Sequence, residues 1–494
     1  MCFTENCLKI GIAMHNEYQH YDYSRLKQAS ITLLLKKPSL DRNVLKNYRP
    51  VSNLPFLSKI LEKVVSKVLS DHRTQNRLDI PLQSAYRRHH STETALLKVH
   101  NDVLRALDRK ECVFLVLLDL SAAFDTVDHD HLKVRLEQQF GVSHAALQWL
   151  DSYLTERQQA VTVGGIGSET RTLKYGVPQG SVLGLELFKD YASPLASLIQ
   201  SFDVLFHGYA DDTQMYITFA PGPDEAIALD KMQRCIAAVK VWMSQNYLKL
   251  NDDKTEFMVI GSPSNLKKVA TEHIIVGGHK ILKSKQVKNI GAFFDSSATM
   301  EAQVVKTAQT AWFHLHSIGK IRAYLTTEQA RCVVHAYVTS RLDQNNSLLS
   351  GISEKKILFK LQRVQNAAAK LILGGKKQDH ATPLRKKLNW LPVPQRVVFK
   401  TVLLVYKTLH GDGPAYLREM LKPYTCGRGG MRSADDTTRL QVPATQCVTY
   451  GDRAFSINGP KAWNSLPPHV RLSTSVTSFK TAAKTHLYEK AYPL

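Results

Sequence analysis

The chain has 494 residues, with 65 Lys and Arg against 43 Asp and Glu, so its formal charge is +22. A hydrophobic content of 44 % is ordinary for globular proteins and excludes a wholly disordered chain. The charge is uneven, because residues 351–494 hold 24 Lys and Arg against eight Asp and Glu. This local charge of +16 indicates a polyanionic partner such as nucleic acid, although a basic surface that serves solubility gives the same count.

Other classes of protein are disfavoured by the sequence. The longest apolar run near the middle, residues 112–118, is far shorter than the roughly 18 residues that a membrane helix needs. The first 30 residues are polar and show no secretory or other targeting signal. The seven cysteines form no CxxC pair, which favours reduced thiols in an intracellular protein over a disulfide framework or a zinc knuckle.

The first half of the chain alternates between strand and helix patterns. Residues 31–35 predict a short strand, and residues 57–69 have apolar side chains at helical spacing. Ser91 or Thr92 is a candidate N-cap for a second helix that ends near residue 107. One face of that helix holds the apolar residues Leu96, Val99, Val103 and Leu104.

The central part predicts a sheet with helices around it. Residues 113–118 are a continuous apolar run, typical of a strand buried on both faces, and the run ends at Asp119. Two further runs, 204–206 and 215–219, flank the polar turn 210–213 and predict a β-hairpin. Residues 226–248 then predict a long amphipathic helix.

Beyond residue 300 the chain is predicted to be mostly helical. Apolar residues form one helical stripe over 357–372, and residues 397–409 predict a second, shorter helix. Residues 427–438 (GRGGMRSADDTT) are predicted to be a loop or domain linker.

Three aspartates follow these central strands. Asp119 ends the buried strand, and Asp211 and Asp212 occupy the hairpin turn. If the strands share a sheet, the carboxylates meet at one edge and repel each other unless a cation lies between them. Oxygen ligands suit magnesium, and two magnesium ions about 3.5–4 Å apart can promote phosphoryl transfer. The alternative is that Asp211 and Asp212 are only turn formers.

Seven blocks of sequence occur in a fixed order, and two more follow them, NWLPVPQR (389–396) and YGDRAFSINGPKAWNSLP (450–467). Together they favour a metal site over simple turn formers at Asp211 and Asp212. The chain resembles the reverse transcriptase of non-LTR (LINE-type) retrotransposons, most like those of the chicken-repeat clade. The seven blocks are KNYRPVSNLPFLSKILEKVV (46–65), QSAYRRHHSTETALL (83–97), FLVLLDLSAAFDTVDHDHL (114–132), YGVPQGSVLG (175–184), YADDTQMY (209–216), LKLNDDKTEFMVIG (248–261) and VKNIGAFFDS (287–296).

The resemblance implies an α+β right-hand polymerase with fingers, palm and thumb, an antiparallel palm sheet and a mostly helical, basic C-terminal region. The expected divisions are a divergent N-terminal segment (1–30), fingers (31–110), palm (111–298), a helical thumb-like region (299–426) and a basic C-terminal region (427–494), with a reverse transcriptase core over 31–298.

The resemblance also implies the residues of a metal site. Asp119 matches the first metal-binding aspartate, and Asp211 and Asp212 match the aspartate pair of the YxDD motif. The backbone carbonyl of Leu120 would complete the metal shell. Phe124 stands where the family places a steric gate against the ribose 2′-hydroxyl, although a core aromatic beside a buried strand is also plausible.

Five further positions carry over from the family's motifs. Gln179 and Gly180 match the loop that positions template and incoming nucleotide. Lys254 matches a lysine proposed to protonate the departing pyrophosphate, and a lone lysine is otherwise a surface charge. Arg49 and Arg87 match basic finger residues that meet the triphosphate, a role that suits the planar, always-charged guanidinium.

The implied reaction extends a primer 3′-hydroxyl with deoxynucleoside triphosphates (dNTPs) on an RNA template, with two Mg²⁺ ions. Template RNA, primer or target DNA and dNTPs are the implied partners, with no membrane and no obligate protein partner. The family implies an intracellular location, in nucleus and cytoplasm. The family's endonuclease precedes the polymerase, so a chain with only about 30 residues before the fingers is expected to be an N-terminally truncated reading frame.

Two alternatives stay open. A catalytically inactive nucleic-acid-binding remnant would keep the same fold and basic C-terminal region. A polymerase of the group II intron or telomerase type is more distant, because the blocks at 450–467 argue against it.

Some positions depart from the family pattern. Leu185 and Glu186 replace Pro and an aliphatic residue, and a glutamate buried there without a partner would be costly. Ala85 and His89 replace glycines, which costs stability if the backbone there needs φ > 0. These departures spare the aspartates but are typical of a decaying genomic copy.

Aromatic residues also stand among the basic residues of the C-terminal third. Trp390, Tyr450 and Trp463 are candidates for a platform on which single-stranded RNA stacks, and the alternative is that they are core residues.

Overall fold

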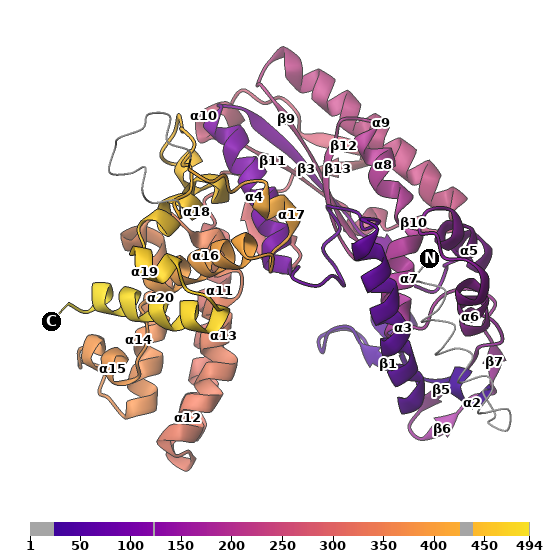
Figure 1. Ribbon diagram of the computed structural model, residues 1–494, viewed down its shortest axis with the longest axis horizontal. Helices are drawn as coiled ribbons and strands as arrows, with labels where there is room; N and C mark the ends of the chain where they lie inside the picture. Colours follow the sequence, from indigo (N-terminus) through magenta and orange to yellow (C-terminus); the bar gives the residue numbers. More distant parts are fainter. Residues whose placement is uncertain (1–23, 122–123, 425–437, 494) are drawn as a thin grey trace.

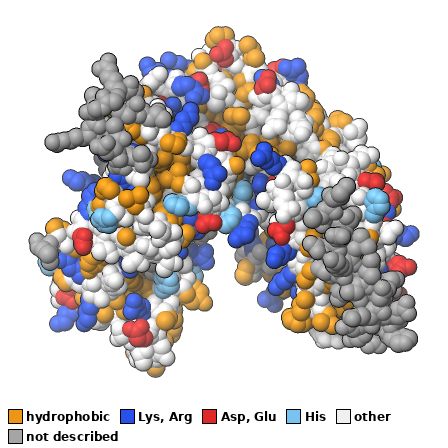
Figure 2. Space-filling view, viewed as in Figure 1, with side chains coloured by type: hydrophobic (Ala, Val, Ile, Leu, Met, Phe, Trp, Pro, Cys, Tyr) orange, Lys and Arg blue, Asp and Glu red, His pale blue; other side chains and the backbone are white. Residues whose placement is uncertain are grey.

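The computed structural model describes residues 24–121, 124–424 and 438–493. The chain forms two lobes that meet at a central sheet (Figure 1). One lobe holds the N-terminal strands and the helices at 56–75 and 129–200. The other holds the helices that follow residue 300, and the helix at 92–108 lies beside it. Between the lobes the surface is hollowed, with Lys and Arg side chains on both sides of the hollow (Figure 2).

The first lobe contains a small mixed sheet. Its strand order is β2-β1-β5-β6, with β7 paired to β5. β1 (Gln28–Leu35) pairs antiparallel with β2 (Tyr48–Asn53) and parallel with β5 (Gln158–Val163), and Ala29, Ile31 and Leu54 form a small core. The other elements here are α2 (Ser24–Lys27), η1 (Leu45–Asn47), α3 (Phe56–Gln75), β6 (Ile166–Gly167) and β7 (Arg171–Thr172).

The palm is a four-stranded antiparallel sheet in the order β11-β3-β9-β8. Its central strand, β3 (Cys112–Leu118), is buried at every position except Leu117 because helices cover both faces of the sheet. The remaining strands are β8 (Leu205–Tyr209), β9 (Asp212–Phe219) and β11 (Glu256–Ile260). The predicted strand at 113–118 and the predicted hairpin are thus confirmed.

Alternate residues of β3 face two different cores. Phe114 and Val116 pack with helices of the first lobe, whereas Val113 and Leu115 pack with helix α4 (Thr92–Asp108) and the second lobe. The helices of the first core are α5 (His129–Gln138), α6 (His144–Leu154), α7 (Leu183–Tyr191), α8 (Pro194–Gln200) and α9 (Pro223–Gln245).

Shorter strands and helices adjoin the palm sheet. β4 (Leu120–Ser121) pairs with β10 (Lys249–Leu250), and two hairpins follow the sheet. The hairpin strands and adjoining helices are η2 (Asp252–Lys254), α10 (Pro263–Leu266), β12 (His273–Val276), β13 (His279–Leu282), β14 (Gln286–Asn289) and β15 (Ala292–Asp295).

The second lobe is helical, as predicted. Its helices are α11 (Glu301–Ile321), η3 (Arg322–Tyr324), α12 (Thr327–Val334), the π-helical η4 (His335–Thr339), α13 (Ser340–Asp343), η5 (Asn346–Leu349), the π-helical η6 (Glu354–Leu358), α14 (Phe359–Leu373), α15 (Ala381–Lys387), α16 (Val393–Leu409), α17 (Ala415–Arg418), η7 (Gly451–Arg453), α18 (Phe455–Asn464), α19 (Pro468–Arg471) and α20 (Val476–Ala491).

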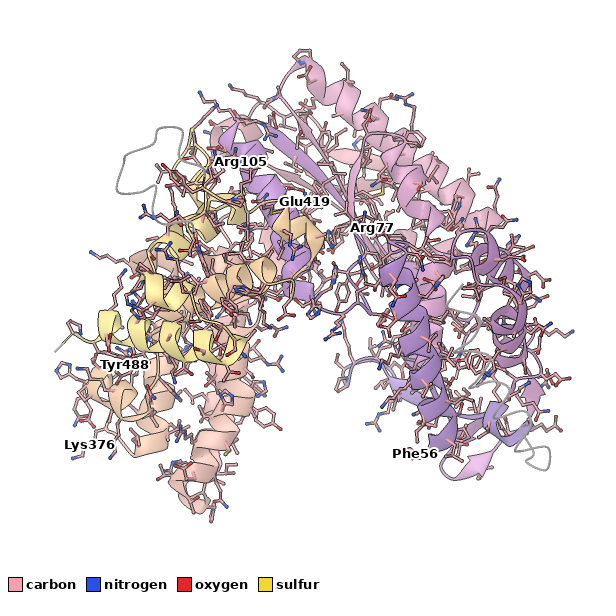
Figure 3. All side chains as sticks on the ribbon, in the orientation of Figure 1. Phe56, Arg77, Arg105, Lys376, Glu419 and Tyr488 are labelled. Atoms are coloured by element: carbon pink, nitrogen blue, oxygen red, sulfur yellow. The ribbon has the colours of Figure 1, made fainter. Side chains whose placement is uncertain are left out.

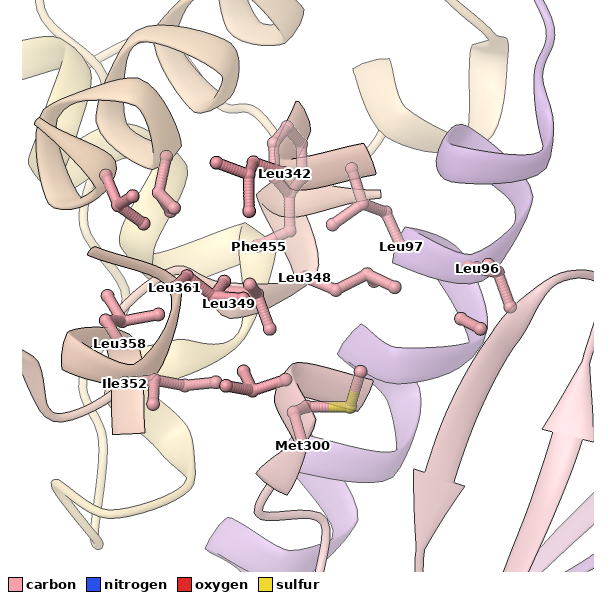
Figure 4. Close-up of a cluster of buried hydrophobic side chains, with 14 of the residues drawn as sticks. Leu96, Leu97, Met300, Leu342, Leu348, Leu349, Ile352, Leu358, Leu361 and Phe455 are labelled. Carbon is pink, nitrogen blue, oxygen red and sulfur yellow. The ribbon is translucent and has the colours of Figure 1, made fainter. Parts of the chain in front are cut away.

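Helix α4 (Thr92–Asp108) joins the palm to the helical lobe. Ser91 caps it as predicted, because the Ser91 side chain accepts from the N–H of Thr94 while the Thr94 side chain accepts from the N–H of Ser91. Leu96 and Leu97 pack into a core that also holds Leu348 of η5 and Phe455 of α18 (Figure 4). Residues on both sides of the predicted linker therefore share one core, while the linker itself falls largely on 425–437, outside the described residues.

The α+β class and the antiparallel palm sheet agree with the sequence-based expectation. The exact division into fingers, palm, thumb and C-terminal region stays a prediction. No helix within the described ranges has the length and apolar character needed to span a membrane.

Candidate active site

The palm hairpin brings the aspartates to one edge of the sheet. Tyr209 pairs with Asp212, so residues 210 and 211 alone form the turn between β8 and β9. Ala210 takes a left-handed conformation there, with φ of 59°. On the other side of β9, Thr213 pairs with Leu118, which places Asp119 beside the turn. Sheet register, fixed by buried apolar residues, therefore positions the carboxylates.

The carboxylates influence one another electrostatically. The pKa of Asp212 is raised to about 6, chiefly by partial burial and then by the charges of Asp211 and Asp119. Burial likewise raises the pKa of Asp211, with a contribution from Asp119, while Arg49 and Lys254 act in the opposite direction. Ionisation of each carboxyl group is therefore unfavourable while the others are ionised, and a bound cation would reduce this repulsion.

Lys254 lies directly at this cluster. Its Nζ donates to Oδ2 of Asp119 at 2.5 Å. The short helix η2, which carries Lys254, is held by the backbone N–H of Asn251, which donates to the carbonyl of Asp119 at 2.9 Å. Asp119, Asp212 and Lys254 line one cavity of about 220 Å³. The structure thus brings together Asp119, Asp211, Asp212 and Lys254, as the resemblance implied.

The donor chemistry fits a divalent cation, because carboxylate oxygens that repel one another are suitable ligands for magnesium. In the described part of the chain, no three His, Cys, Asp or Glu side chains are gathered tightly enough to form a ready metal cage. Asp119 instead pairs with Lys254. Leu120, whose carbonyl is the other expected ligand, lies in β4 beside Leu250 of β10.

A buried glutamine, Gln83, holds the turn between β8 and β9 by hydrogen bonds. Gln83 Oε1 accepts from the backbone N–H of Ala210 at 3.1 Å and from that of Ala85 at 3.1 Å. Its Nε2 donates to the carbonyl of Ala210 at 3.3 Å. The backbone N–H of Gly208 donates to the carbonyl of Leu82 at 2.8 Å. This role was not predicted from the sequence, where only its place in the block at 83–97 singles Gln83 out.

Tyr86 is a second residue whose place at the site was not predicted. Its pKa is raised to about 12 by partial burial and by the charges of nearby Asp211 and Asp212. The residue is 42 % exposed, and its backbone is left-handed with φ of 56°. An exposed aromatic ring beside the aspartates is a suitable surface for a nucleobase or sugar. Its adjacency to Arg87 within the matched block was the available signal.

The loop at 178–180 is joined to strand β2. The backbone N–H of Ser52 donates to the carbonyl of Gln179 at 2.7 Å. Gly180 has φ of 122°, and a Cβ there would lie 2.7 Å from the carbonyl oxygen of Ser52, so only glycine fits. Arg49, exposed on the same strand, acts on the pKa of Asp211. Gln179, Gly180 and Arg49 therefore belong to one assembly near the carboxylates.

Phe124 is half-buried and contacts Phe188 of α7, with ring centroids 5.0 Å apart. Its carbonyl accepts from the backbone N–H of Val177 at 2.8 Å. Gly176 lies against the same segment, where a Cβ would come within 2.9 Å of the Phe124 carbonyl oxygen. These contacts fix the position of the ring, and they are consistent with both the gate and the core interpretation.

Arg87 lies apart from the carboxylates. Its guanidinium donates to the carbonyls of Ile80 at 2.6 Å and Gln83 at 3.1 Å, and lies 3.7 Å from Asp79. Burial lowers its pKa, while Asp79 acts in the opposite direction. The structure therefore places Arg87 where it supports the 80–83 segment, and a contact with a triphosphate stays a prediction.

The unusual Glu186 is buried but paired. It forms an ion pair with Arg73 of α3, and Arg73 Nη1 also donates to Asp190 Oδ2 at 2.7 Å. Lys189 Nζ lies 3.1 Å from Asp79, which in turn lies 3.7 Å from Arg73. With Arg87, this network balances its cations against its carboxylates, so the expected cost of an unpaired glutamate does not arise. Leu185 is half-buried on α7.

The two expected glycine positions differ in their backbone. His89 is left-handed, with φ of 64°, so a side chain there carries the expected strain. Ala85 is fully buried and is absent from the left-handed residues, which instead include its neighbour Tyr86. The condition for strain, a positive φ, is therefore met at His89 and is not met at Ala85.

Comparison with known proteins identifies the family. Residues 35–294 match the family described as reverse transcriptase (RNA-dependent DNA polymerase). The probable RNA-directed DNA polymerase from transposon BS of Drosophila melanogaster is 27 % identical over 380 residues, 75 % of this chain and 41 % of that protein. The RNA-directed DNA polymerase from mobile element jockey of the same species is 27 % identical over 57 % of this chain and 30 % of its own length. The chain thus spans less than half of these relatives.

Similar solved structures include apo telomerase from Candida tropicalis, with 11 % identity and a TM-score of 0.40 over 75 % of this chain and 62 % of that one. The relatives carry the names of transposons and mobile elements, and the chicken-repeat clade stays a prediction. The match to the family model covers more than half of the chain, including every aspartate of the palm cluster. The chain therefore belongs to the reverse transcriptase (RNA-dependent DNA polymerase) family and has the right-hand polymerase fold.

Proposed function

We propose that this chain is an RNA-directed DNA polymerase that extends a primer 3′-hydroxyl with deoxynucleoside triphosphates on an RNA template. The observation that carries the proposal is the cluster of Asp119, Asp211 and Asp212, where burial and mutual repulsion raise the pKa of Asp212 to about 6. A fold rarely keeps such repulsion unless the site binds a cation or performs chemistry.

In this reaction the primer 3′-oxygen attacks the α-phosphorus, and the bond from that phosphorus to the β-phosphate oxygen breaks. Two Mg²⁺ ions, when bound, would supply neutralisation of the phosphate charge and of the attacking oxygen. Asp119, Asp211 and Asp212 would hold them, with the carbonyl of Leu120. Because Lys254 contacts Asp119 at 2.5 Å, its ammonium is within reach of the same region, where it would protonate the departing pyrophosphate.

The surrounding residues would bind and orient the substrates. Arg49, exposed on β2, would meet the triphosphate. Gln179 and Gly180, joined to Ser52, would support the template and the incoming nucleotide. The basic residues of the C-terminal third would bind the phosphates of template RNA and primer DNA.

Primer extension on an RNA template tests the proposal. The wild-type chain is expected to extend the primer with Mg²⁺ and not with chelator. Asp211→Ala and Asp212→Ala are each expected to lower the rate at least about 100-fold, because charge stabilisation in the transition state is lost. Asp71→Ala, an exposed change on α3, is the matched control. Absence of extension by folded wild-type protein that still binds RNA would favour the inactive remnant instead.

The steric-gate role of Phe124 has a separate test. Phe124→Val removes the ring that lies against Phe188, so a ribonucleotide 2′-hydroxyl would meet less hindrance. We expect ribonucleotide incorporation to rise by about 10-fold or more relative to dNTP incorporation, a change of about 1.4 kcal/mol in discrimination. Unchanged sugar selection in primer extension would assign Phe124 to the core alone.

A further inference from the structure

A large cavity lies in the helical lobe, away from the palm. Its volume is about 820 Å³, within the range of about 300–1,000 Å³ typical of ligand pockets. Helices α12, α16 and α20 and the π-helical segment η4 contribute to its wall. Segments of π-helix are frequent at functional sites. This helical-lobe cavity shares no lining residue with the cavity beside the aspartates.

The wall of the helical-lobe cavity is basic, with Lys and Arg side chains outnumbering the carboxylates of Glu328 and Asp343. Asp343 is already paired, because Arg396 Nε donates to its Oδ1 at 2.8 Å. Lys480 and Lys484 of α20 form no ion pair within the described ranges. They stand four residues apart on one helix face, where like charges repel unless an anion lies between them. The wall thus presents two cations to which the described residues offer no carboxylate.

An aromatic side chain completes the wall. Trp390 is half-buried and lines the cavity. Its backbone is held on both sides, since its N–H donates to the carbonyl of Arg385 at 3.0 Å and its carbonyl accepts from the Tyr492 hydroxyl at 2.9 Å. Gln365 Nε2 donates to the next carbonyl, that of Leu391, at 2.9 Å. The indole is therefore presented by a rigid segment, which lowers the cost of ordering it on binding.

We propose that the helical-lobe cavity binds an unpaired nucleotide of a single-stranded nucleic acid, with the base stacked on Trp390 and the flanking phosphates held by Lys480 and Lys484. Aromatic rings beside cations form the usual platform for single strands. A duplex keeps its bases paired and stacked inside, so it offers no free base to an indole within a cavity. The proposal rests on the proposed function only in taking RNA as the natural ligand.

This assignment accounts for the block NWLPVPQR, which the palm chemistry leaves without a role. It also distinguishes among Trp390, Tyr450 and Trp463, the three aromatics that the sequence analysis offered as a stacking platform. Trp463 is 2 % exposed and its indole N–H donates to the carbonyl of Thr438 at 2.8 Å, so the platform prediction is wrong for Trp463. Tyr450 and Trp390 are both half-buried and pack against the main core, but Tyr450 does not line the helical-lobe cavity. Of the three aromatics, Trp390 is therefore the one that a ligand in this cavity would meet.

The lysines are tested by the salt dependence of binding. The probe is a fluorescein-labelled oligouridylate, measured by anisotropy in chelator with no dNTP, so polymerase activity does not enter. Lys480→Gln/Lys484→Gln is expected to reduce the slope of log affinity against log salt by about 1.4, which is about 0.7 for each phosphate that the variant no longer neutralises. Both lysines lie on α20, the helix that carries the labelled Tyr488 (Figure 3). Lys267→Gln/Lys268→Gln makes the same charge change at two exposed lysines after α10, outside the cavity and outside residues 351–494, and is expected to keep the wild-type slope.

The stacking contact is tested at Trp390. Trp390→Ala is expected to weaken oligouridylate binding by between about 5-fold and about 100-fold. Trp390→Phe keeps a ring and a folded segment, so it is expected to lose less affinity but all of the tryptophan quenching that the oligonucleotide causes. A saturating hairpin duplex that fills the palm is expected to leave this quenching in place.

Three results would overturn the proposal. The first is an unchanged salt slope in the Lys480→Gln/Lys484→Gln variant. The second is wild-type affinity and quenching in Trp390→Phe. The third is complete displacement of the oligouridylate by the duplex, which would place single-strand binding in the palm. Loss of primer extension with intact oligouridylate quenching would defeat the proposed function and leave this site standing.

Discussion

At the scale of single residues, Asp212 shows how burial and neighbouring carboxylates make an ionised side chain unfavourable. Its side chain lies at the start of β9, partly open to solvent, yet its pKa is raised to about 6 from an ordinary value of 3.8. Burial is the largest cause, followed by the charges of Asp211 and Asp119. Folding therefore favours the protonated form of this carboxyl, and the ionised form destabilises the metal-free protein.

This sign leads to a prediction about stability and pH. Between about pH 4 and pH 6 the folded state holds a proton on Asp212 that the unfolded state has lost, so stability falls as pH rises through this window. Asp212→Asn removes that decline. Without divalent cation, we expect the variant to melt at a higher temperature than wild type at pH 7.5, and the difference to shrink at pH 4.

Calorimetry over this pH range measures the effect. Magnesium is expected to reverse the order at pH 7.5 by stabilising wild type more than Asp212→Asn, because the ion binds the folded carboxylates. If Asp212→Asn melts at a lower temperature than wild type at pH 7.5 without divalent cation, the ionised Asp212 does not destabilise the folded protein.

Glu186 shows a limit of residue-level prediction. Its place in the sequence indicated a charge that is costly if buried without a partner. Its partner, Arg73, lies on a helix 113 residues earlier in the chain, and α3 contacts α7 only in the folded protein. Pairing between helices far apart in the chain leaves no local pattern in a sequence. The sequence therefore predicted a cost for Glu186 only if the side chain had no partner.

At the scale of elements, the β8–β9 hairpin was predictable from the sequence, but the hydrogen bonds from Gln83 to its turn were not. Apolar runs around a polar turn predicted the hairpin. The double contact of Gln83 with Ala210 depends on a loop 127 residues earlier, and a glutamine carries no signal of such a role. The sequence therefore indicated the carboxylates but not the side chain that holds their turn.

The variant Gln83→Ala tests whether the hydrogen bonds of Gln83 hold the β8–β9 turn in place. Without an acceptor for the Ala210 and Ala85 N–H groups the turn is free to move, and small displacements of reacting groups are costly in rate. We expect single-turnover extension to slow by about 10- to 100-fold. Gln303→Ala removes another buried glutamine, in α11, and serves as the control that is expected to retain the rate. An unchanged rate in Gln83→Ala would show that the hairpin holds its own turn.

Helix α3 shows what periodicity leaves open. The pattern at 57–69 predicted a helix, and α3 covers it. The apolar side chains form only part of its buried face, because Leu57 and Ile60 are 54 % and 44 % exposed while Glu62 and Arg73 are almost fully buried. Glu62 Oε2 accepts from the backbone N–H of Val182 at 2.6 Å, at the start of α7. Charged contacts with another helix therefore decide this packing together with hydrophobic burial.

At the scale of the whole molecule, the basic C-terminal third is part of the main core. Ser84 Oγ lies 2.8 Å from His207 Nε2 of β8 and 2.9 Å from the hydroxyl of Tyr416 in α17. Tyr416 OH also donates to Thr94 Oγ1 of α4 at 3.1 Å. Hydrogen bonds thus link the β8–β9 hairpin to the helical lobe. Composition predicted a separate basic region, since charge counts do not register such interactions.

Asp108, at the end of α4, anchors the C-terminal segment. Its Oδ1 accepts from the backbone N–H groups of Gln446 at 2.9 Å and Cys447 at 2.7 Å, and Oδ2 lies 3.1 Å from Arg105. Asp108→Ala would leave these two N–H donors without their acceptor. The free energy of unfolding is expected to fall by about 3 kcal/mol, because two hydrogen bonds to a charged group disappear.

The consequence should extend beyond one segment, because α4 packs against both β3 and η7. Asp108→Ala is expected to speed amide exchange in residues 446–463 and to lower the midpoint of urea unfolding for the whole chain in one transition. Asp71→Ala, exposed on α3, is expected to change neither. Two separate transitions, with faster exchange confined to the C-terminal segment, would show that this segment folds independently of the polymerase core.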